Sequence, residues 1–147
     1  MVLSFMIEPR KKPAETPLAW LRFAAENLQV AEQALSFEEP TSHTICFLCQ
    51  SAAEKFLKAY LIAQGWKLER THDIVVLLGL CADYDDAFAG LTSDSAILNE
   101  YAVAGRYPGD LAFEDIDLMD AQEAVAIVCQ IRDLVADKLV SSSHPEG

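Results

Sequence analysis

The stretch Cys46-Phe-Leu-Cys-Gln-Ser-Ala-Ala-Glu-Lys-Phe-Leu-Lys-Ala-Tyr-Leu61 decides the fold, because it combines a helical apolar pattern with a row of polar residues. Apolar or small residues recur at the three- and four-residue spacing of an amphipathic helix that buries one face. They are Ile45, Leu48, Cys49, Ala52, Ala53, Phe56, Leu57, Tyr60 and Ala63. Gln50, Glu54 and Lys58 are four residues apart and therefore line one side of this helix, with Lys55 beside them.

The same pattern and the capping signals around it predict about five helices. Thr16 and Pro17 fit the N-cap and the first position of a helix, and Thr71 fits a second N-cap, followed by an acid in the first turn. The expected helices cover residues 17–37, 41–64, 72–82, 87–105 (or 93–105, with a break near Thr92) and 117–140. Residues 74–80 also fit a strand, but their continuity with Leu-Leu-Gly-Leu-Cys favours a helix.

Five helices with short connections predict an all-α fold, an antiparallel up-and-down bundle over residues 17–140. Residues 1–16 are expected to be a flexible lead-in and residues 141–147 a disordered tail. No segment approaches the roughly 20 apolar residues that span a bilayer, and the first residues do not follow the order of a secretory signal. We therefore expect a cytoplasmic protein without a membrane partner. The apolar content of 52% also predicts a buried subunit interface, and hence a homodimer, whose interface is expected to include residues 101–107 and the apolar face that the bundle leaves over.

The formal net charge of −12 argues against a nucleic-acid partner without excluding one, because phosphate contacts need clustered Lys and Arg. Between Tyr107 and Ile131 the chain has no basic residue and six acidic ones. This stretch is either a solvated surface or a recognition face for a basic partner.

Four cysteines raise the question of metal or redox chemistry. Cys46 and Cys49 have a C-x-x-C spacing, but they lie in the apolar run of a helix, without a second Cys or His pair at ligand spacing. We expect them to be reduced core residues. No metal or cofactor is predicted.

Three groups of polar residues are candidates for a site. Glu54 and Lys58 fit a surface ion pair worth about 0.2–0.5 kcal/mol. Histidine is the residue type that changes charge near neutral pH, and His72 fits a packing or capping residue as well as a general base. Arg106, followed by Tyr107, could bind a phosphate or carboxylate, or interact with the end of the preceding helix.

Gln50-x-x-x-Glu54-Lys55-x-x-Lys58-Ala, together with Thr71-His-Asp and Arg106-Tyr-Pro-Gly, resembles the signature of the HEPN domain family. This resemblance implies a small helical domain whose members are in many cases ribonucleases or partners of a nucleotidyltransferase. It also implies that the signature face is a shared structural or binding feature, and that active members pair two motifs across a dimer.

The resemblance is incomplete at the ribonuclease motif. Active members carry an Arg and a His separated by four to six other residues, whereas this chain has Leu111, Ala112 and Phe113 at these places, after Asp110. The resemblance and this departure from it together imply a non-catalytic, dimeric binding module with a nucleotidyltransferase-type partner, and we expect a nucleotide or anion site at Arg106, Tyr107 and His72. The alternatives are a ribonuclease toxin of a toxin-antitoxin pair and a purely structural helical adaptor.

Overall fold

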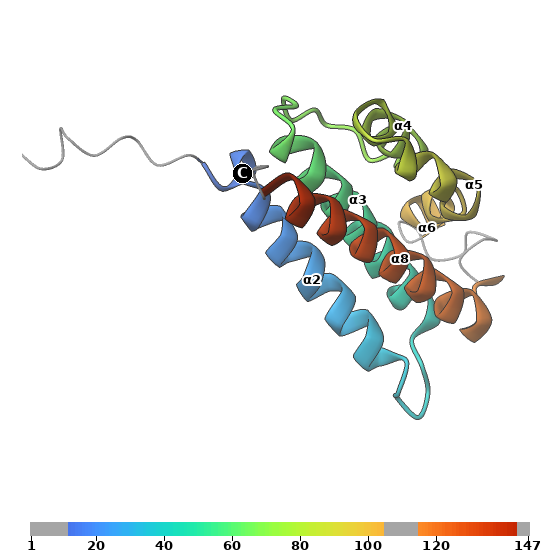
Figure 1. Cartoon of the computed structure of the whole chain (residues 1–147). Helices are drawn as coiled ribbons and strands as arrows, with labels where there is room; N and C mark the ends of the chain where they lie inside the picture. Colours follow the sequence, from blue (N-terminus) through green and yellow to red (C-terminus); the bar gives the residue numbers. More distant parts are fainter. Residues whose placement is uncertain (1–11, 105–114, 144–147) are drawn as a thin grey trace, which may run out of the picture.

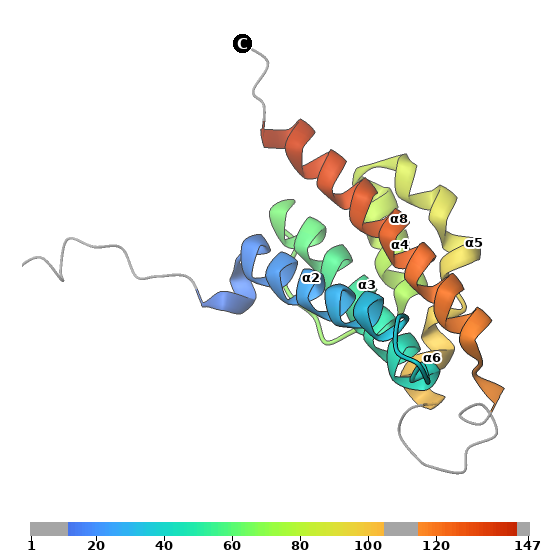
Figure 2. The same cartoon turned by 90° about the horizontal axis from the view of Figure 1, so that it is seen from below.

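The computed structural model describes residues 12–104 and 115–143 of the chain. Within these ranges every regular element is a helix, so the predicted all-α fold is confirmed. Three long helices lie side by side: α2 (Pro17–Ala34), α3 (Ser42–Ala63) and α8 (Leu118–Ser143). Figures 1 and 2 show that α3 and α8 run in one direction and α2 in the other, as in an up-and-down bundle.

The chain returns from the end of α3 to the start of α8 through short elements that cover another side of α3. They are α4 (Ile74–Tyr84), the 3-10 helix η2 (Asp86–Leu91), α5 (Thr92–Ser95) and α6 (Leu98–Ala104). The fourth predicted helix is therefore a series of pieces. One break falls at Thr92 as expected, and another lies between α5 and α6. Thr92, Ser93 and Asp94 follow one another at the first of these two breaks, and these residue types are poor helix formers.

The ends of the long helices agree with local sequence signals. Thr16 occupies the N-cap position of α2 in an extended conformation, and Pro17 is the first helical residue. The helix ends at Ala34, three residues before the predicted end. Gly65 follows α3 with φ of 93°, a left-handed conformation that glycine adopts without steric cost. The predicted lead-in contains a 3-10 turn, η1 (Pro13–Glu15).

The start of α4 corrects one prediction. Asp73, not Thr71, is the N-cap, and its Oδ1 accepts hydrogen bonds from the backbone N–H groups of Val75 and Val76, at 2.9 and 3.2 Å. The Thr71 hydroxyl oxygen accepts the N–H of Asp73 at 3.4 Å. The helix starts two residues later than a Thr71 cap would place it, because the carboxylate reaches two free N–H groups of the first turn.

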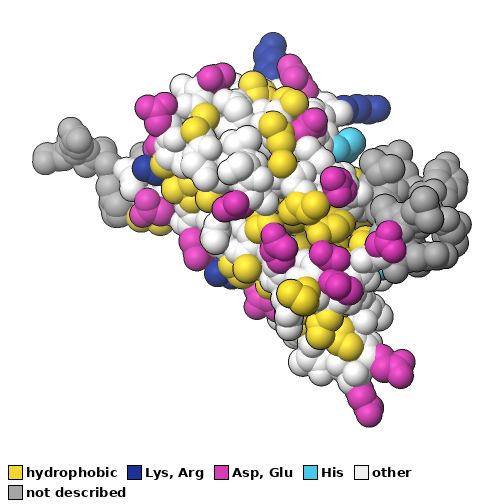
Figure 3. Space-filling model, turned by 90° about the vertical axis from the view of Figure 1, so that its right-hand side faces the viewer, with side chains coloured by type: hydrophobic (Ala, Val, Ile, Leu, Met, Phe, Trp, Pro, Cys, Tyr) yellow, Lys and Arg dark blue, Asp and Glu magenta, His cyan; other side chains and the backbone are white. Residues whose placement is uncertain are grey.

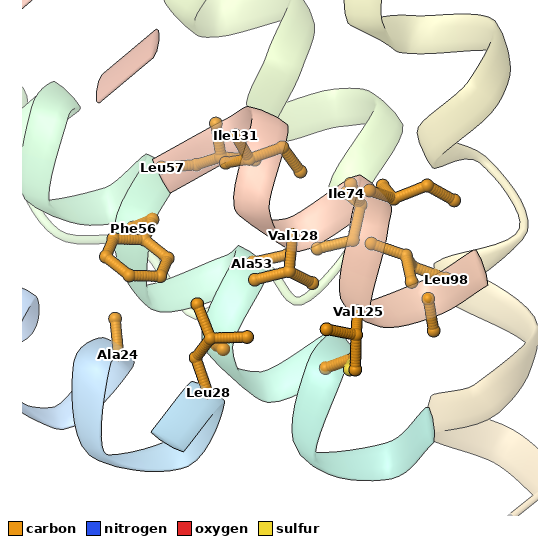
Figure 4. Close-up of a cluster of buried hydrophobic side chains, with 14 of the residues drawn as sticks. Ala24, Leu28, Ala53, Phe56, Leu57, Ile74, Leu98, Val125, Val128 and Ile131 are labelled. Atoms are coloured by element: carbon orange, nitrogen blue, oxygen red, sulfur yellow. The ribbon is translucent and has the colours of Figure 1, made fainter. Parts of the chain in front are cut away.

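The core surrounds α3, which packs against α2, α8, α4 and α6. Figure 4 shows Ala24 and Leu28 of α2 next to Phe56 of α3, whereas Leu57 of α3 lies beside Ile131 of α8, with side chains of α4 and α6 beyond them. The largest side chains that are fully buried are Phe88, Ile45, Leu57, Leu61, Ile74, Leu77, Leu78, Leu98 and Ile131. Because α3 packs against each of the other four helices named here, α2, α4, α6 and α8, it is the central element of the fold.

Three of the four cysteines belong to this core. Cys46, Cys49 and Cys81 are buried with free thiols, and Cys129 is half-buried. Burial raises the pKa of Cys46 and of Cys81 to about 12, because a thiolate would lose its hydration there. These thiols are therefore in the protonated, weakly reactive form at neutral pH.

The cap of α4 predicts a pH-dependent contribution to stability. Hydrogen bonds from the Val76 N–H and the Asn99 amide lower the pKa of Asp73, so its stabilising effect is present above the pKa of about 3.9 in the unfolded chain and is lost as pH falls through the folded-state pKa. Asp73→Ala should lower the free energy of unfolding by about 1 kcal/mol at pH 7, and by less below about pH 4.

Urea unfolding followed by circular dichroism at pH 7 and pH 3 measures this difference. Asp83→Ala, which removes an exposed acid from the same helix, is the control and should change stability little at either pH. An equal effect of Asp73→Ala at both pH values would contradict the assigned role of the carboxylate.

Candidate functional site

The signature row of α3 is not the exposed strip that the sequence predicts. Lys58 is 3% exposed and Glu54 is 12% exposed, and Gln50 is buried as well. The interpretation of Glu54 and Lys58 as a surface ion pair is therefore wrong. His72 in the loop before α4 and Trp20 near the start of α2 cover them, and both residues are many positions away from them in sequence.

Glu54 is the centre of a hydrogen-bonded group that we call the α3 polar network, formed by Gln50, Glu54, Lys58 and His72. Its Oε2 lies 3.0 Å from the Lys58 ammonium, and its Oε1 lies 2.8 Å from Nδ1 of His72. The Gln50 amide donates to the same Oε1 at 3.5 Å and to the backbone carbonyl of His72 at 3.3 Å. Both carboxylate oxygens are therefore engaged, and the network holds the loop before α4 against α3.

Lys58 extends the network to α2. Its ammonium lies 5.4 Å from the centroid of the Trp20 ring, within the range of a cation–π interaction. A buried ammonium is costly unless an anion and further polar groups surround it. Here the Glu54 carboxylate supplies the negative charge and the indole face covers the remaining side. The charge of Lys58 thus links α2, α3 and the loop that carries His72.

His72 is the exposed member of the network, with 66% of its side chain accessible. In the neutral ring, donation from Nδ1 to the Glu54 carboxylate leaves Nε2 as the nitrogen with the lone pair. A carboxylate that orients an imidazole in this way is the usual arrangement behind a general base. The sequence indicated His72 as a candidate but did not indicate Glu54 as its partner.

The cap of α4 connects this region to α6. The Asn99 amide donates to Oδ1 of Asp73 at 2.9 Å, and Oδ1 of Asn99 accepts the Ile74 N–H at 2.7 Å. Tyr101, two residues further along α6, is buried close to Cys46. The expected subunit interface included Tyr101, and this part of the expectation is wrong because its ring packs inside the single chain.

Arg106 and Tyr107, the main residues of the predicted anion site, lie outside the residues that the structure describes, and so do Asp110 to Phe113. What the structure describes is the helix that leads to them. Since α6 ends at Ala104 and is attached to α4 through Asn99, the chain enters this segment from a fixed position. The ligand-binding role of Arg106 stays a prediction.

Lys55, which the sequence groups with Lys58, belongs to a different contact. Its ammonium donates to Oδ1 of Asn27 at 2.7 Å and to the Ser51 hydroxyl at 3.0 Å, at the boundary of α2 and α3. Burial lowers its pKa, because the charged form loses hydration. Asn27 was not predicted as a functional residue, although an Asn among the apolar positions of α2 was a visible signal.

The surface on the right-hand side of Figure 1 carries many Asp and Glu side chains, and Figure 3 shows hydrophobic side chains between them. Lys and Arg are sparse on this face, in keeping with 23 acidic and 11 basic residues in the chain. Such a surface repels phosphate. In the described ranges, no helix is long and apolar enough to cross a membrane, and no three His, Cys, Asp or Glu side chains are grouped as metal ligands.

The chain is a small all-α bundle. Its second long helix, α3, carries a row of Gln50, Glu54 and Lys58 that is bonded to the Thr71-His-Asp segment before α4. These features are those of a class of small helical domains. The HEPN domain model matches residues 18–139, and the chain therefore belongs to the HEPN domain family. The crystal structure of an archaeal HEPN homologue has the same fold, with a TM-score of 0.67 and 24% identity over 84% of this chain and 97% of that one. A comparison with curated proteins finds no significant match.

The α3 polar network predicts a large effect from a small change. Glu54→Gln removes the negative charge beside Lys58 and should lower the free energy of unfolding by about 2–3 kcal/mol, because a buried ammonium then lacks its anion. His72→Ala removes only the exposed part of the network and should cost about 0.2–1 kcal/mol.

Urea unfolding at pH 7 compares these variants with Glu39→Gln, which makes the same chemical change at an exposed position between α2 and α3. The control should lie within about 0.5 kcal/mol of the wild type. If Glu54→Gln is as mild as Glu39→Gln, the network does not stabilise the fold.

Proposed function

We propose that this HEPN protein is a non-catalytic binding module that forms a homodimer, pairs with a nucleotidyltransferase-type protein and binds a nucleotide or anion at Arg106 and Tyr107. The observation that carries the proposal is the mutual bonding of the signature residues. Gln50, Glu54 and Lys58 are occupied by one another and by the loop before α4. Because Gln50, Glu54 and Lys58 are hydrogen-bonded within the domain, they stabilise its packing. We therefore infer that ligand binding or catalysis in this family depends on residues at other positions.

The ribonuclease motif supports the same proposal from the sequence side. Cleavage of RNA without a metal needs a group with a pKa near neutrality to move the proton of the 2′-hydroxyl or to protonate the leaving oxygen. Leu111, Ala112 and Phe113 occupy the places after Arg106 where active members carry His. None of these three side chains transfers a proton.

The residues before and at Arg106 favour anion binding. A guanidinium presents planar pairs of donors that match phosphate oxygens, and its loss of freedom on binding is smaller when the preceding helix is fixed. Asn99 attaches α6 to the cap of α4, seven residues before Arg106 in the sequence. Tyr107 offers an aromatic face for a base, and such stacking contributes about 1–3 kcal/mol in single-strand binders. The net charge of −12 opposes an anionic ligand, so we expect weak affinity.

Isothermal titration calorimetry with ATP, AMP and phosphate tests the ligand. Wild type should bind a nucleotide with a dissociation constant of about 0.1–1 mM, which corresponds to about −4 to −5.5 kcal/mol. Arg106→Ala should abolish this binding, and Arg22→Ala, which removes an exposed arginine from α2, should leave it unchanged. Absence of heat at millimolar ligand, or equal binding by all proteins, would leave Arg106 without a binding role.

A ribonuclease is the second candidate, and the geometry of His72 favours it. The imidazole is exposed, and its Nδ1 is held by a carboxylate, which is how a general base is oriented. His72 would have to replace the missing His of the motif. Because the surface is acidic and the motif incomplete, we expect purified protein to cleave RNA no faster than a buffer control and its expression to permit growth.

An RNA cleavage assay on wild type, Arg106→Ala and His72→Ala separates the two functions. Cleavage by wild type that both variants abolish would establish the ribonuclease and overturn the non-catalytic module. Cleavage that persists in both variants would point to a contaminating nuclease and would leave the module as the proposed function.

A further inference from the structure

The helix α4 is apolar on every side, although only one of its sides faces the core. Residues 74–82 are all Ile, Val, Leu, Gly, Cys or Ala. Ile74, Leu77, Leu78 and Cys81 are buried, at the three- and four-residue spacing of a single helix face. In globular proteins a helix that is apolar all round is enclosed on all sides. The packing of this one chain therefore leaves the outward side of α4 unexplained.

The outward side of α4 exposes apolar side chains that follow one another along the helix. Val75 is 36% exposed, Val76 48% and Tyr84 50%, and Leu80 is half-buried. Val76, Leu80 and Tyr84 are four residues apart, so they lie in one row. We call the surface formed by Val75, Val76, Gly79, Leu80, Asp83 and Tyr84 the α4 outer face. Large apolar side chains on adjoining helix turns form a patch that is typical of a contact with another molecule.

Gly79 lies in the middle of the α4 outer face, and the described residues do not require a glycine there. In a helix, glycine is less stabilising than alanine. A methyl group at this position would nevertheless have open space, because no atom of the described residues outside the local helix backbone and the adjacent residues lies within 4 Å of it. A helix surface without a side chain allows the backbone of another helix to approach closely. Gly79 therefore favours a helix as the occupant, with its crossing point at the centre of the face.

The charges around the α4 outer face are acidic. Residues 71–104, which contain α4, η2, α5 and α6, include six acidic residues and no Lys or Arg. Figure 3 looks onto the side of the molecule where these elements lie in Figure 1, and shows Asp and Glu side chains around hydrophobic ones. Asp85 is paired with Lys138 of α8 at 3.0 Å, whereas Asp83 and Asp86 are exposed and form no ion pair within the described residues. They lie at the C-terminal end of α4, where the helix dipole also favours a cation.

These charges favour a basic partner over a second copy of the chain. Each copy has a formal net charge of −12, so two copies would bring acids against acids at this face. The nearest bases in the preceding sequence, Lys67 and Arg70, come before the opposite end of α4 and have Glu69 between them. A helix with Lys or Arg beside an apolar strip matches both features, because its strip covers the apolar residues while its charges reach Asp83 and Asp86.

We propose that the α4 outer face binds an amphipathic, basic helix of a partner protein, which crosses α4 at Gly79 and places Lys or Arg against Asp83 and Asp86. The proposal rests on the protein partner that is part of the proposed function, and it gives that partner a docking surface. The bound helix covers Val75 and Val76, which the single chain leaves accessible.

A designed peptide tests the apolar part of the contact. The probe is a fluorescein-labelled helical peptide with Leu along one side and Lys along the others, and fluorescence anisotropy measures its binding. Val76→Asp should weaken binding by about 10-fold or more. Val30→Asp is the matched control, since Val30 of α2 is 47% exposed against 48% for Val76, and should leave binding unchanged. Equal weakening by both substitutions, or no binding by wild type, would overturn the docking surface.

Gly79→Leu distinguishes a helix crossing from simple attraction to an apolar surface. Leucine is a better helix former than glycine and has open space at this position, so urea unfolding should show a chain at least as stable as wild type. The added side chain should still weaken binding of the Lys peptide by about 10-fold, because it keeps the two helices apart. Unchanged or tighter binding would contradict the crossing at Gly79.

A second peptide, in which Glu replaces every Lys, tests the charges. Wild type should prefer the Lys peptide, and the double variant Asp83→Lys, Asp86→Lys should lose this preference. The double variant Glu26→Lys, Glu39→Lys makes the same charge change at exposed acids of α2 and the loop after it, and should keep the preference. Equal loss in both double variants would mean that net charge decides, and the pairing with Asp83 and Asp86 would be wrong.

Size-exclusion chromatography with light scattering tests a second copy as the occupant. Wild type and Val76→Asp should have the same oligomeric state, because the proposed occupant is a different protein. A dimer that Val76→Asp converts to a folded monomer would assign the α4 outer face to a second copy and overturn the basic partner. None of these outcomes affects the calorimetric test at Arg106 or the RNA cleavage assay, so the docking surface and the rest of the proposed function fail independently.

Discussion

The buried ion pair between Lys58 and Glu54 is the interaction on which the arrangement of this domain depends. Lys58 is 3% exposed, and an ammonium at that depth is tolerated only where an anion and other polar groups surround it. Glu54 provides the anion, and Trp20 of α2 covers the ammonium with its ring. The other oxygen of Glu54 holds His72, which fixes the chain just before α4. One charge thus connects the first helix, the second helix and the start of the third.

A chain of hydrogen bonds connects His72 to α6, the helix that precedes Arg106 in the sequence. Asp73 follows His72 and caps α4, and Asn99 links that cap to α6. The chain then enters the segment that carries Arg106. The part of the HEPN signature that the structure describes is therefore a set of packing contacts, which hold the loop before α4 against α3.

Much of the fold followed from local patterns, and the differences have physical causes. The periodicity and the caps around Pro17 and Gly65 predicted the long helices, because these signals lie within a few residues of the ends that they define. The burial of Lys58 could not be predicted in this way. A helical pattern shows which residues share a face, but Trp20 and His72, which cover this one, are distant in sequence.

The candidate site was predicted less completely than the fold. His72 was identified as a candidate base, but its carboxylate partner depends on the loop folding back onto α3. Lys55 was grouped with Lys58, whereas the structure places it against Asn27 of α2, since Lys55 points about 100° away from the adjacent Glu54 around the helix axis. The role of Arg106 depends on residues outside the described ranges and rests on the sequence and the family resemblance.

A double-mutant cycle on Glu54→Gln and Lys58→Met, measured by urea unfolding at pH 7, tests the central claim most directly. If the pair is the buried interaction described here, the double variant will be more stable than Glu54→Gln alone, because removing both charges leaves no unpaired ammonium. A coupling energy of at least about 1 kcal/mol is the predicted result. Losses that simply add, with a coupling energy near zero, would contradict the claim that this ion pair organises the domain.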